Sequence, residues 1–600
     1  MLNFNPYIKD KGKFNVSLFG AVMKRTALAL TLILMLSVSL LYGLGLHSVE
    51  ADATATIYIR ADGSVEGTDK IQRDGNVYTL IADLNGAVDA MGVFIAIEKD
   101  GVVLDGGHRT IQGTGTGVAI AAYGRKDITI KNTKIVNFGV GIELRITDYE
   151  SNATASNNQI LDNYIDATYF AIDLNTEKGT VSGNTVISRN SKYGVLFDCN
   201  NTVFSNNAFV DGGLIVYEPR VGNVLSGNTI NGKPLVYLEH QSNQIIDGAA
   251  QVILTDCSNM MVRNVDTSAD LRVTITLFRT SNTRITDCRG NIVLRNSHSN
   301  TIVNNQLADV GSSVSYSNAA IELSASYNNT IADNSILATG SLGVSLLGSS
   351  YNNVQGNQIS STGQAGVIIE STIESKPAFN YIHENSITCT ENGIYLRGGA
   401  RDNFVFKNLI TDCKNAVMLS SGHENTFVGN NISRARQYAV YLALSDDNNF
   451  YHNNFVDNAK HAYEQHEFYW MGYSTYYSER NMWDNGEEGN YWSDYTGYDA
   501  DGDGIGDTPH PVYENFTDRY PLTAPFDINS VTVIPAVWSP PSSPELTPTP
   551  IQSPTPEPTY SPEPTPSSES FPTKIAISSI IAAVAIVGLG LLVYFKKRRH

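Results

Sequence analysis

The chain has 600 residues, with 41 Lys and Arg against 60 Asp and Glu and a formal net charge of -19. This acidic balance argues against nucleic acid or an anionic lipid surface as the main partner, because both bind best to a basic face. The five cysteines are too few and too scattered for a disulfide framework, and none of them forms a CxxC pair.

Residues 1–53 are predicted to be a leader and signal peptide. The basic pair Lys24 and Arg25 precedes an apolar run at residues 26–46, and small residues follow at 51–53 with the spacing that a signal peptidase recognises. We therefore predict cleavage near residue 53. An uncleaved membrane anchor is the alternative, because the apolar run is long.

The region from residue 54 to residue 530 is predicted to consist of short strands. Residues 54–125 form an N-terminal cap with the first coils, residues 126–460 carry a sequence repeat, and residues 461–530 form an aromatic C-terminal cap. Apolar residues alternate at period two throughout the repeats, and helical periodicity is missing. A leucine-rich repeat of similar period would need a Leu scaffold and a convex helix, so we exclude it.

The repeating unit is Asn-x4-Asn-x-apolar, and successive copies start mostly 20 to 24 residues apart. Stacked coils of parallel, in-register strands fit this period and place equivalent residues about 4.8 Å apart. Asn side chains at that spacing can form hydrogen-bonded ladders along the stack. The predicted ladder pairs are Asn158 and Asn163, Asn223 and Asn228, Asn300 and Asn305, Asn329 and Asn334, Asn352 and Asn357, Asn380 and Asn385, Asn403 and Asn408, Asn425 and Asn430, and Asn449 and Asn454.

The C-terminal end of the chain is predicted to be a stalk and a membrane anchor. Residues 531–573 are rich in Pro, Ser and Thr, a composition that favours extended conformations over a packed core. Residues 574–596 form the predicted transmembrane helix, and the basic tail at 597–600 would stay in the cytoplasm. These features predict a type I single-pass protein on the extracellular face of the cell membrane.

The Asn-x4-Asn coils followed by GNYWSDYTGYDADGDGIGDTP resemble the NosD-like family of β-helix proteins, over roughly residues 54–525. The resemblance implies an all-β, single-stranded right-handed parallel β-helix of the pectin-lyase-like type. The coil pattern is also similar to PbH1 repeats of the carbohydrate-binding and sugar-hydrolysis (CASH) group, which includes pectate lyases. The family's name-giving members help to load copper into nitrous oxide reductase. Many archaeal surface proteins with a Pro-rich stalk and a terminal anchor look similar.

A calcium loop is predicted in the C-terminal cap. Carboxylates at alternate positions can wrap a hard cation, a backbone carbonyl can complete the set, and Gly504 permits the sharp turn. The expected ligands are Asp499, Asp501, Asp503, the carbonyl of Ile505, and Asp507. The twelfth position is His510 instead of Glu, so the loop differs from an EF-hand. We expect a structural role for this site, and a plain acidic turn is the alternative.

Two carboxylates are the candidates for polysaccharide chemistry. Glu143 and Asp173 occupy the same outward strand position on neighbouring coils, with Arg145 close by. Glycoside hydrolysis uses such carboxylate pairs, whereas lyases of this fold use calcium and a basic residue. The alternative is an ordinary polar outer face without catalysis.

His461 and His466 are the candidates for copper, because they form the closest pair of imidazoles near the cap. A solvated charged turn is the alternative reading of the same residues. Outward Tyr395 and Tyr441 could instead stack on sugar rings. The leading prediction is thus a non-catalytic surface scaffold that engages carbohydrate or wall polymer. A polysaccharide hydrolase or lyase and a copper-delivery accessory protein are the alternatives.

Overall fold

The computed structural model describes residues 56–146, 155–187, 193–268, 273–308, 319–337, 342–372, 375–389, 391–465, 467–470, 473–476, 481–514 and 516–533. All of them belong to the first of two compact units, Met1–Trp538 and Ser539–His600. The predicted signal peptide, transmembrane helix and basic tail, and the stalk beyond residue 533, lie outside the described residues. Within those described residues, no helix is long and apolar enough to cross a membrane.

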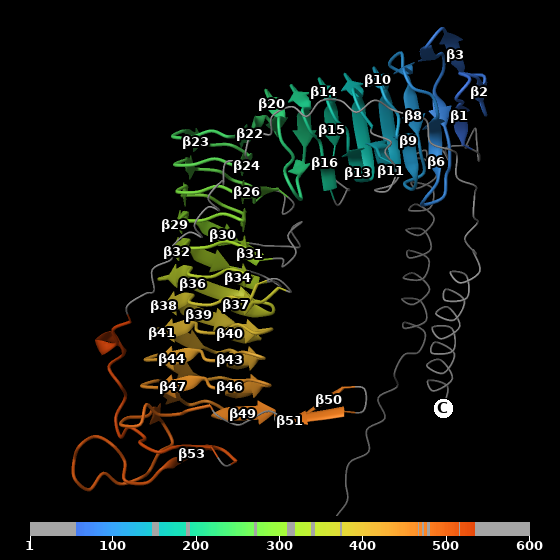
Figure 1. Cartoon of the computed structure of the whole chain (residues 1–600). Coiled ribbons are helices and arrows are strands. Elements are labelled where there is room, and N and C mark those ends of the chain that lie inside the picture. Colours follow the sequence, from blue (N-terminus) through green and yellow to red (C-terminus); the bar gives the residue numbers. More distant parts are fainter. Residues whose placement is uncertain are drawn as a thin grey trace, which may run out of the picture. The chain divides into compact units, whose positions relative to one another are not determined.

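The structure is a parallel β-helix, in which each turn of the chain adds one strand to each of two or three sheets (Figure 1). The strands of the first stack form two sheets. One sheet holds two rows of strands that merge at the long strands β11 and β13. It contains β1 (Ile57–Ile59), β5 (Leu84–Asn85), β6 (Val93–Ile97), β8 (Thr110–Gln112), β9 (Val118–Tyr123), β11 (Lys134–Arg145), β13 (Tyr164–Leu174), β15 (Thr185–Ile187), β16 (Tyr193–Phe197), β18 (Ala208–Val210), β19 (Leu214–Ile215) and β21 (Thr229–Ile230). The other contains β3 (Ile71–Asp74), β4 (Val77–Leu80), β7 (Val103–Asp105), β10 (Thr129–Lys131), β12 (Gln159–Leu161), β14 (Thr180–Ser182), β17 (Val203–Ser205) and β20 (Val224–Ser226).

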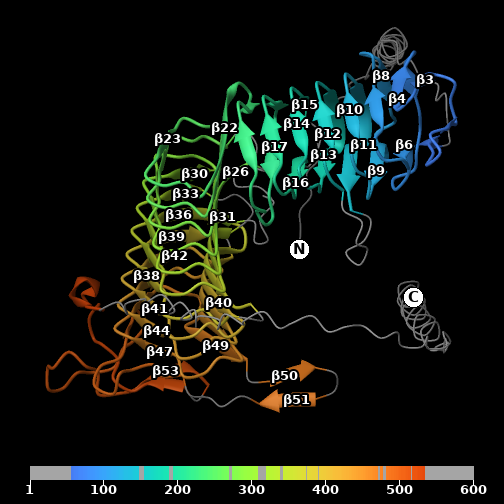
Figure 2. The ribbon, with the colours of Figure 1, turned by 45° about the horizontal axis from the view of Figure 1, so that its top comes forward.

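The second stack has three rows of strands. Figure 2 shows the successive strands of a row lying one above another. The first row contains β22 (Lys233–Glu239), β24 (Gln251–Thr255), β26 (Thr274–Phe278), β28 (Asn291–Arg295), β31 (Ala319–Ser324), β34 (Leu342–Leu347), β37 (Ala365–Glu370), β40 (Asn392–Arg397), β43 (Asn415–Ser420), β46 (Tyr438–Ala443) and β49 (Ala462–Gln465). The second contains β23 (Ile245–Asp247), β25 (Met261–Arg263), β27 (Arg284–Thr286), β29 (Thr301–Val303), β32 (Thr330–Ala332), β35 (Asn353–Gln355), β38 (Tyr381–His383), β41 (Phe404–Phe406), β44 (Thr426–Val428) and β47 (Asn449–Tyr451). The third contains β30 (Gln306–Ala308), β33 (Ser335–Leu337), β36 (Gln358–Thr362), β39 (Ser386–Cys389), β42 (Leu409–Thr411), β45 (Asn431–Ser433), β48 (Asn454–Val456) and β52 (Tyr491–Trp492).

Apolar residues at equivalent positions of successive coils form columns inside the stacks. One column in the first row of the second stack pairs β-branched residues through seven successive strands, and all of its members are fully buried. Burial of each such side chain contributes about 2 kcal/mol. The column comprises Ile292, Ile321, Val344, Val367, Ile394, Val417 and Val440.

Asn side chains form continuous ladders at the turns, as the repeat predicts. In a typical rung, the Nδ2 group of Asn408 donates to Asn430 Oδ1 at 3.0 Å and to the carbonyl of Ile382 at 2.7 Å. The backbone N–H of Asn408 also donates to Asn430 Oδ1, at 3.0 Å, so each buried amide is satisfied along the stack. The two ladders of the second stack comprise Asn300, Asn329, Asn352, Asn380, Asn403, Asn425, Asn448 and Asn481, and Asn305, Asn334, Asn357, Asn385, Asn408, Asn430, Asn453 and Asn490. A ladder in the first stack comprises Asn163, Asn184, Asn207 and Asn228.

The outermost predicted rungs differ from the rest of the ladders. Asn158 is buried and donates to Thr176 Oγ1 at 3.4 Å, in place of a further Asn. The prediction of Asn449 and Asn454 as the last pair was wrong by one residue. The ladder residues are Asn448 and Asn453, whereas Asn449 and Asn454 are the first residues of strands β47 and β48.

A backbone conformation explains this one-residue shift. On the coils before the cap, the residue that precedes each ladder Asn adopts a left-handed conformation, which Asn, Asp and Gly tolerate best. Asp447 has φ 55° and His452 has φ 57°, so the ladder positions are the residues that follow them. A run of two Asn residues hides this distinction in the sequence, because either Asn can be aligned with the repeat.

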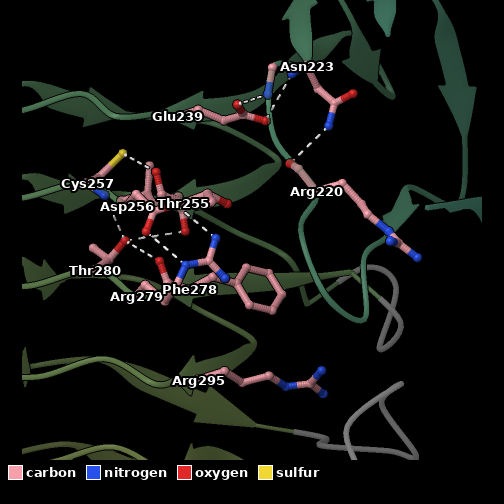
Figure 3. Close-up of polar contacts among 12 residues, drawn as sticks. Arg220, Asn223, Glu239, Thr255, Asp256, Cys257, Phe278, Arg279, Thr280 and Arg295 are labelled. Carbon is pink, nitrogen blue, oxygen red and sulfur yellow. Dashed lines mark hydrogen bonds and ion pairs between the residues drawn. The ribbon is translucent and has the colours of Figure 1, made fainter. Parts of the chain in front are cut away.

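The two stacks join where β21 and β22 form an antiparallel pair and β22 then begins the parallel pairing with β24. Above the last coil of the first stack, a Glu takes the place of the Asn that accepts backbone hydrogen bonds elsewhere in the ladders. Glu239 accepts from the backbone N–H groups of Gly222, at 2.8 Å, and Asn223, at 3.2 Å (Figure 3). Gln251 exchanges two hydrogen bonds with the backbone of Leu214 in the same way. These side chains satisfy backbone groups that would otherwise form an open strand edge.

Cysteines contribute one cross-link between coils of the second stack. Cys389 and Cys413, on neighbouring coils, form a disulfide. Cys199, Cys257 and Cys288 are buried free thiols.

Aromatic rings of the C-terminal cap continue the core beyond the last coil. Phe450 stacks on Trp483 with a centroid distance of 4.7 Å, and Phe455 stacks on Trp492 at 4.3 Å. The cap also contains the antiparallel pairs β50 (Glu467–Trp470) with β51 (Tyr473–Tyr476) and β53 (His510–Tyr513) with β54 (Phe516–Asp518), and the short 3-10 helix η1 (Ile528–Ser530). The N-terminal strand β1 pairs with the short strand β2 (Val65–Glu66) in antiparallel fashion. Rings at the end of the stack replace the next coil and cover its apolar edge.

Candidate functional sites

A strip of aromatic side chains lies on the outer face of the first row of the second stack. Tyr395 in β40 is in register with Met418 in β43, which is in register with Tyr441 in β46 and then with Tyr463 in β49. Along these strands the neighbouring residues point inward and are buried, so the four side chains point outward and remain partly exposed. We call these four residues, together with Tyr438, the tyrosine strip.

Three rings of the tyrosine strip, those of Tyr438, Tyr441 and Tyr463, contact one another. The centroids of Tyr441 and Tyr463 are 5.2 Å apart with stacked planes, and Tyr438 lies 5.2 Å from Tyr463. The ammonium group of Lys460 lies 5.4 Å from the centre of the Tyr438 ring. Partial burial, and then the neighbouring phenols, raise the pKa of Tyr441, so its hydroxyl stays protonated. The strip therefore offers an apolar, hydrogen-bonding platform with a cation at its side.

The predicted carboxylate pair lies on the outer face of the first stack. Glu143 in β11 is in register with Asp173 in β13, as the sequence suggests. Arg145 bridges them, with Nε 2.8 Å from Glu143 Oε1 and Nη1 3.4 Å from Asp173 Oδ2. Tyr123, which the sequence analysis missed, donates its hydroxyl to Glu143 Oε2 at 2.5 Å. Tyr123 lies 22 residues before Arg145 and directly beside it in register, so counting one coil backwards would have found it.

Burial dominates the electrostatics of this carboxylate cluster. Only 7% of the Glu143 side chain and 10% of the Asp173 side chain are exposed, against 49% for Arg145. Burial raises the pKa of Asp173 to about 6, with Arg145 opposing and Glu143 adding to the shift. The pKa of Tyr123 is raised as well, by burial and by its hydrogen bond to Glu143. Near neutral pH, one carboxyl group of the pair is thus close to its titration point, which suits general acid catalysis.

The Asp-rich loop of the cap brings three of its predicted ligands together. Carboxylate oxygens of Asp499, Asp501 and Asp503 lie within 4.8 Å of one another. Asp499 accepts hydrogen bonds from the backbone N–H groups of Gly502 and Gly504, and Gly504 has φ 90°. The fourth predicted carboxylate, Asp507, accepts from the backbone N–H of Ala500 at 2.8 Å. Ile505 forms an antiparallel bridge with Leu522, which ties the loop to the rest of the cap.

The predicted copper pair of His461 and His466 falls only in part within the described residues, which do not include His466. His461 instead lies beside Asp494 and His510, and one potential ligand atom from each of the three falls within 4.8 Å of the others. His510 holds the twelfth position of the predicted calcium loop, and Asp494 is not among the predicted ligands. No spacing in the sequence links these three residues, because the loops of the cap bring them together.

Comparisons with known proteins address the fold. A family model described as periplasmic copper-binding protein (NosD) matches residues 235–410 and 372–497, and one described as right handed beta helix region matches residues 94–265. The repeats are those of a NosD-like right-handed β-helix protein. The resemblance in the sequence is thereby confirmed. A comparison with curated proteins gives no match.

Several solved structures resemble this NosD-like chain at low sequence identity. The complex of XylC with xylose matches with a TM-score of 0.20 and 13% identity, covering 34% of this chain and 38% of that chain. The A-module of the Azotobacter vinelandii mannuronan C-5 epimerase AlgE4 gives 0.26 and 15%, covering 59% and 91%. The complex of alginate lyase AlyF-OU02 with G6 gives 0.22 and 13%, covering 68% and 87%. The chain thus spans less than two thirds of the XylC chain, and likenesses this weak do not indicate what it binds.

The donors that a NosD-like protein could offer to copper can be judged from their surroundings. The free thiols of Cys199, Cys257 and Cys288 are buried on different coils, and burial raises the pKa of each of them. Neutral thiols that lie apart make a poor copper site. His461 and His510, with the carboxylate of Asp494 between them, provide a donor set that suits a divalent transition metal. Two imidazoles and one carboxylate therefore fit such an ion better than the cysteines do.

Proposed function

We propose that this chain is an exported, membrane-anchored β-helix protein that binds carbohydrate or wall polymer at the tyrosine strip. The observation that carries the proposal is the outward register of Tyr395, Met418, Tyr441 and Tyr463 on four successive strands. Sugar rings present C–H faces that pack on aromatic rings, and their hydroxyl groups need polar neighbours. The hydroxyl of Tyr441 donates to Gln465 Oε1 at 3.2 Å, so polar groups border the apolar strip.

The shape of the strip favours a polymer over a single sugar. Its members are spaced by one coil, so equivalent groups recur along the stack at about 4.8 Å. Successive units of an extended polysaccharide could each contact one rung. Weak contacts repeated along one chain add up to useful avidity without any single deep pocket.

Retention on immobilised polysaccharides tests this binding function. The full-length protein in mild detergent is passed over a panel of neutral and acidic polymers, and Tyr441→Ala and Tyr463→Ala are compared with it. We expect at least tenfold weaker binding of both variants to the polymer that retains the wild type. Tyr164→Ala is the matched control, because Tyr164 is a partly exposed tyrosine that lies in β13 of the first stack. Equal retention of all four proteins contradicts the assignment.

Polysaccharide cleavage at Glu143 and Asp173 is the second candidate function. The raised pKa of Asp173, about 6, favours it as the acid that protonates a leaving glycosidic oxygen, with Glu143 as nucleophile or base. Against this, Arg145 bridges both carboxylates and a substrate reaches them only when Arg145 swings away. Binding therefore stands first.

New reducing ends and unsaturated uronate absorbance distinguish cleavage from binding. The same polymer panel is incubated with the wild type, Glu143→Gln and Asp173→Asn. Cleavage that disappears in both variants supports the second candidate function. Absence of product across the panel, with retention intact, leaves binding as the function.

We also propose that the Asp-rich loop binds Ca²⁺ in a structural role. Three clustered carboxylates and two backbone N–H donors hold the loop in a curved shape. Oxygen-only ligands at an exposed turn suit a weak extracellular calcium site. The bound ion would relieve repulsion among Asp499, Asp501 and Asp503 and would stiffen the cap.

A further inference from the structure

Three segments of the C-terminal cap meet at one cluster of metal-binding side chains. His461 lies in the turn before β49, Asp494 follows β52, and His510 begins β53. His461 Nε2 lies 2.9 Å from Asp494 Oδ2, and His510 Nε2 lies 3.8 Å from Asp494 Oδ1. One ligand atom from each residue falls within 4.8 Å of the other two. A single ion at about 2.0–2.2 Å from each atom fits that spacing.

One ring nitrogen that faces this cluster is left unsatisfied by the protein. His510 is 7% exposed, and its Nε2 has no hydrogen-bond partner among the described residues. A buried polar atom left without a partner is energetically unfavourable. An ion that accepts the lone pair of His510 Nε2 removes that cost.

Aromatic packing holds the two imidazoles in place. Trp492 stacks on the His510 ring at a centroid distance of 4.9 Å and meets the His461 ring edge-on at 4.7 Å. The indole is itself fixed, because its Nε1 donates to the buried carboxylate of Asp518 at 2.9 Å. Asp494 is the exposed member of the set, with 61% of its side chain accessible to solvent. Two packed imidazoles and one exposed carboxylate make a site open to solvent on one side.

We propose that His461, Asp494 and His510 bind one divalent transition-metal ion, of the Zn²⁺ and Cu²⁺ class, which fastens the cap to the end of the coil stack. Two nitrogen donors favour this class over Ca²⁺ and Mg²⁺, which prefer oxygen ligands throughout. The site is distinct from the Asp-rich loop, whose clustered donors are all carboxylates. The ion would link the turn before β49 to the segment after β52 and to β53, three segments that otherwise meet through packing and hydrogen bonds.

Direct metal binding to the full-length protein tests this site. The protein is stripped with a chelator, exchanged into buffer that contains Ca²⁺, and titrated with Zn²⁺, and bound metal is then measured after dialysis. We expect one more bound Zn²⁺ per chain in the wild type than in Asp494→Asn, or at least a tenfold loss of affinity in that variant. The matched control is His452→Gln, because His452 bonds to Glu488 at 2.6 Å and stacks on Phe526 outside the cluster.

Two further readouts separate this site from adventitious binding. Cu²⁺ is expected to quench the fluorescence of Trp492 in the wild type, and Zn²⁺ added first is expected to prevent that quenching. Zn²⁺ should also raise the Tm of the wild type but not of Asp494→Asn. Asp494 is exposed, so its variant should fold whatever the role of the site. Equal Zn²⁺ content and equal Tm response in the wild type and Asp494→Asn overturn the proposal.

Discussion

Asn425 and Asn448 lie on successive coils, and the Nδ2 group of Asn425 donates to Asn448 Oδ1 at 3.0 Å. The backbone N–H of Asn425 donates to the same oxygen, also at 3.0 Å. The buried side-chain oxygen of Asn448 thus accepts hydrogen bonds from both the backbone and the side chain of Asn425 on the preceding coil. Repeated along the stack, this relationship fixes the register of the coils and accounts for the recurrence of Asn in the sequence.

Asn448→Ala should therefore destabilise the protein far more than Asn449→Ala. The first substitution leaves the N–H and Nδ2 groups of Asn425 without their acceptor in a fully buried turn. We expect a cost of about 3–5 kcal/mol, because several buried hydrogen bonds are broken together. Asn449 points outward at the start of β47 and is only partly buried, so its loss should cost about 0.5 kcal/mol or less. Thermal denaturation of the two variants measures the difference, and the reverse order would invalidate the ladder register.

The pH dependence of stability should carry a contribution from Asp173. Its folded pKa is about 6, above its ordinary value of 3.8, so the folded protein holds the proton more tightly than the unfolded chain. The resulting stabilisation, about 3 kcal/mol, is fully present below pH 4 and is lost as the pH rises through 6. The variant Asp173→Asn has no such proton to lose. The Tm of the wild type relative to this variant should fall between pH 4 and pH 7, and a constant or rising difference would contradict the assignment.

Calcium should stabilise the cap through the Asp-rich loop. At a Ca²⁺ concentration 100-fold above Kd, binding adds about 2.7 kcal/mol, which should raise the Tm by a few degrees. Asp501→Asn removes one clustered carboxylate and should abolish most of that rise. The exposed Asp74, in the β3–β4 hairpin, provides the control Asp74→Asn, which should keep the full response. A Ca²⁺ response that is identical in both variants would place the ion elsewhere.

The sequence predicts the fold well because one physical pattern repeats. Period-two apolar runs and Asn pairs recur once per coil, so an error in one copy is corrected by its neighbours. The same regularity places Glu143 beside Asp173 and Tyr441 on the outer face. Where two adjacent Asn residues fit the pattern equally well, as at 448 and 449, the sequence alone assigns the wrong one.

The cap lies beyond this regularity. Asn481 and Asn490 end the two ladders, but they are nine residues apart instead of five, so the repeat does not find them. His461, Asp494 and His510 come together only because the loops of the cap fold back over Trp492. Contacts made by irregular loops depend on tertiary packing and leave no period in the sequence.

The measurement that tests the central claim most directly is the affinity of the full-length protein for a retained polysaccharide, before and after Tyr441→Ala. The account predicts that the wild type binds at least one polymer, that Tyr441→Ala weakens this binding at least tenfold, and that Tyr164→Ala leaves it unchanged. Binding that is insensitive to Tyr441, or that falls equally in both variants, would contradict the tyrosine strip as the binding surface.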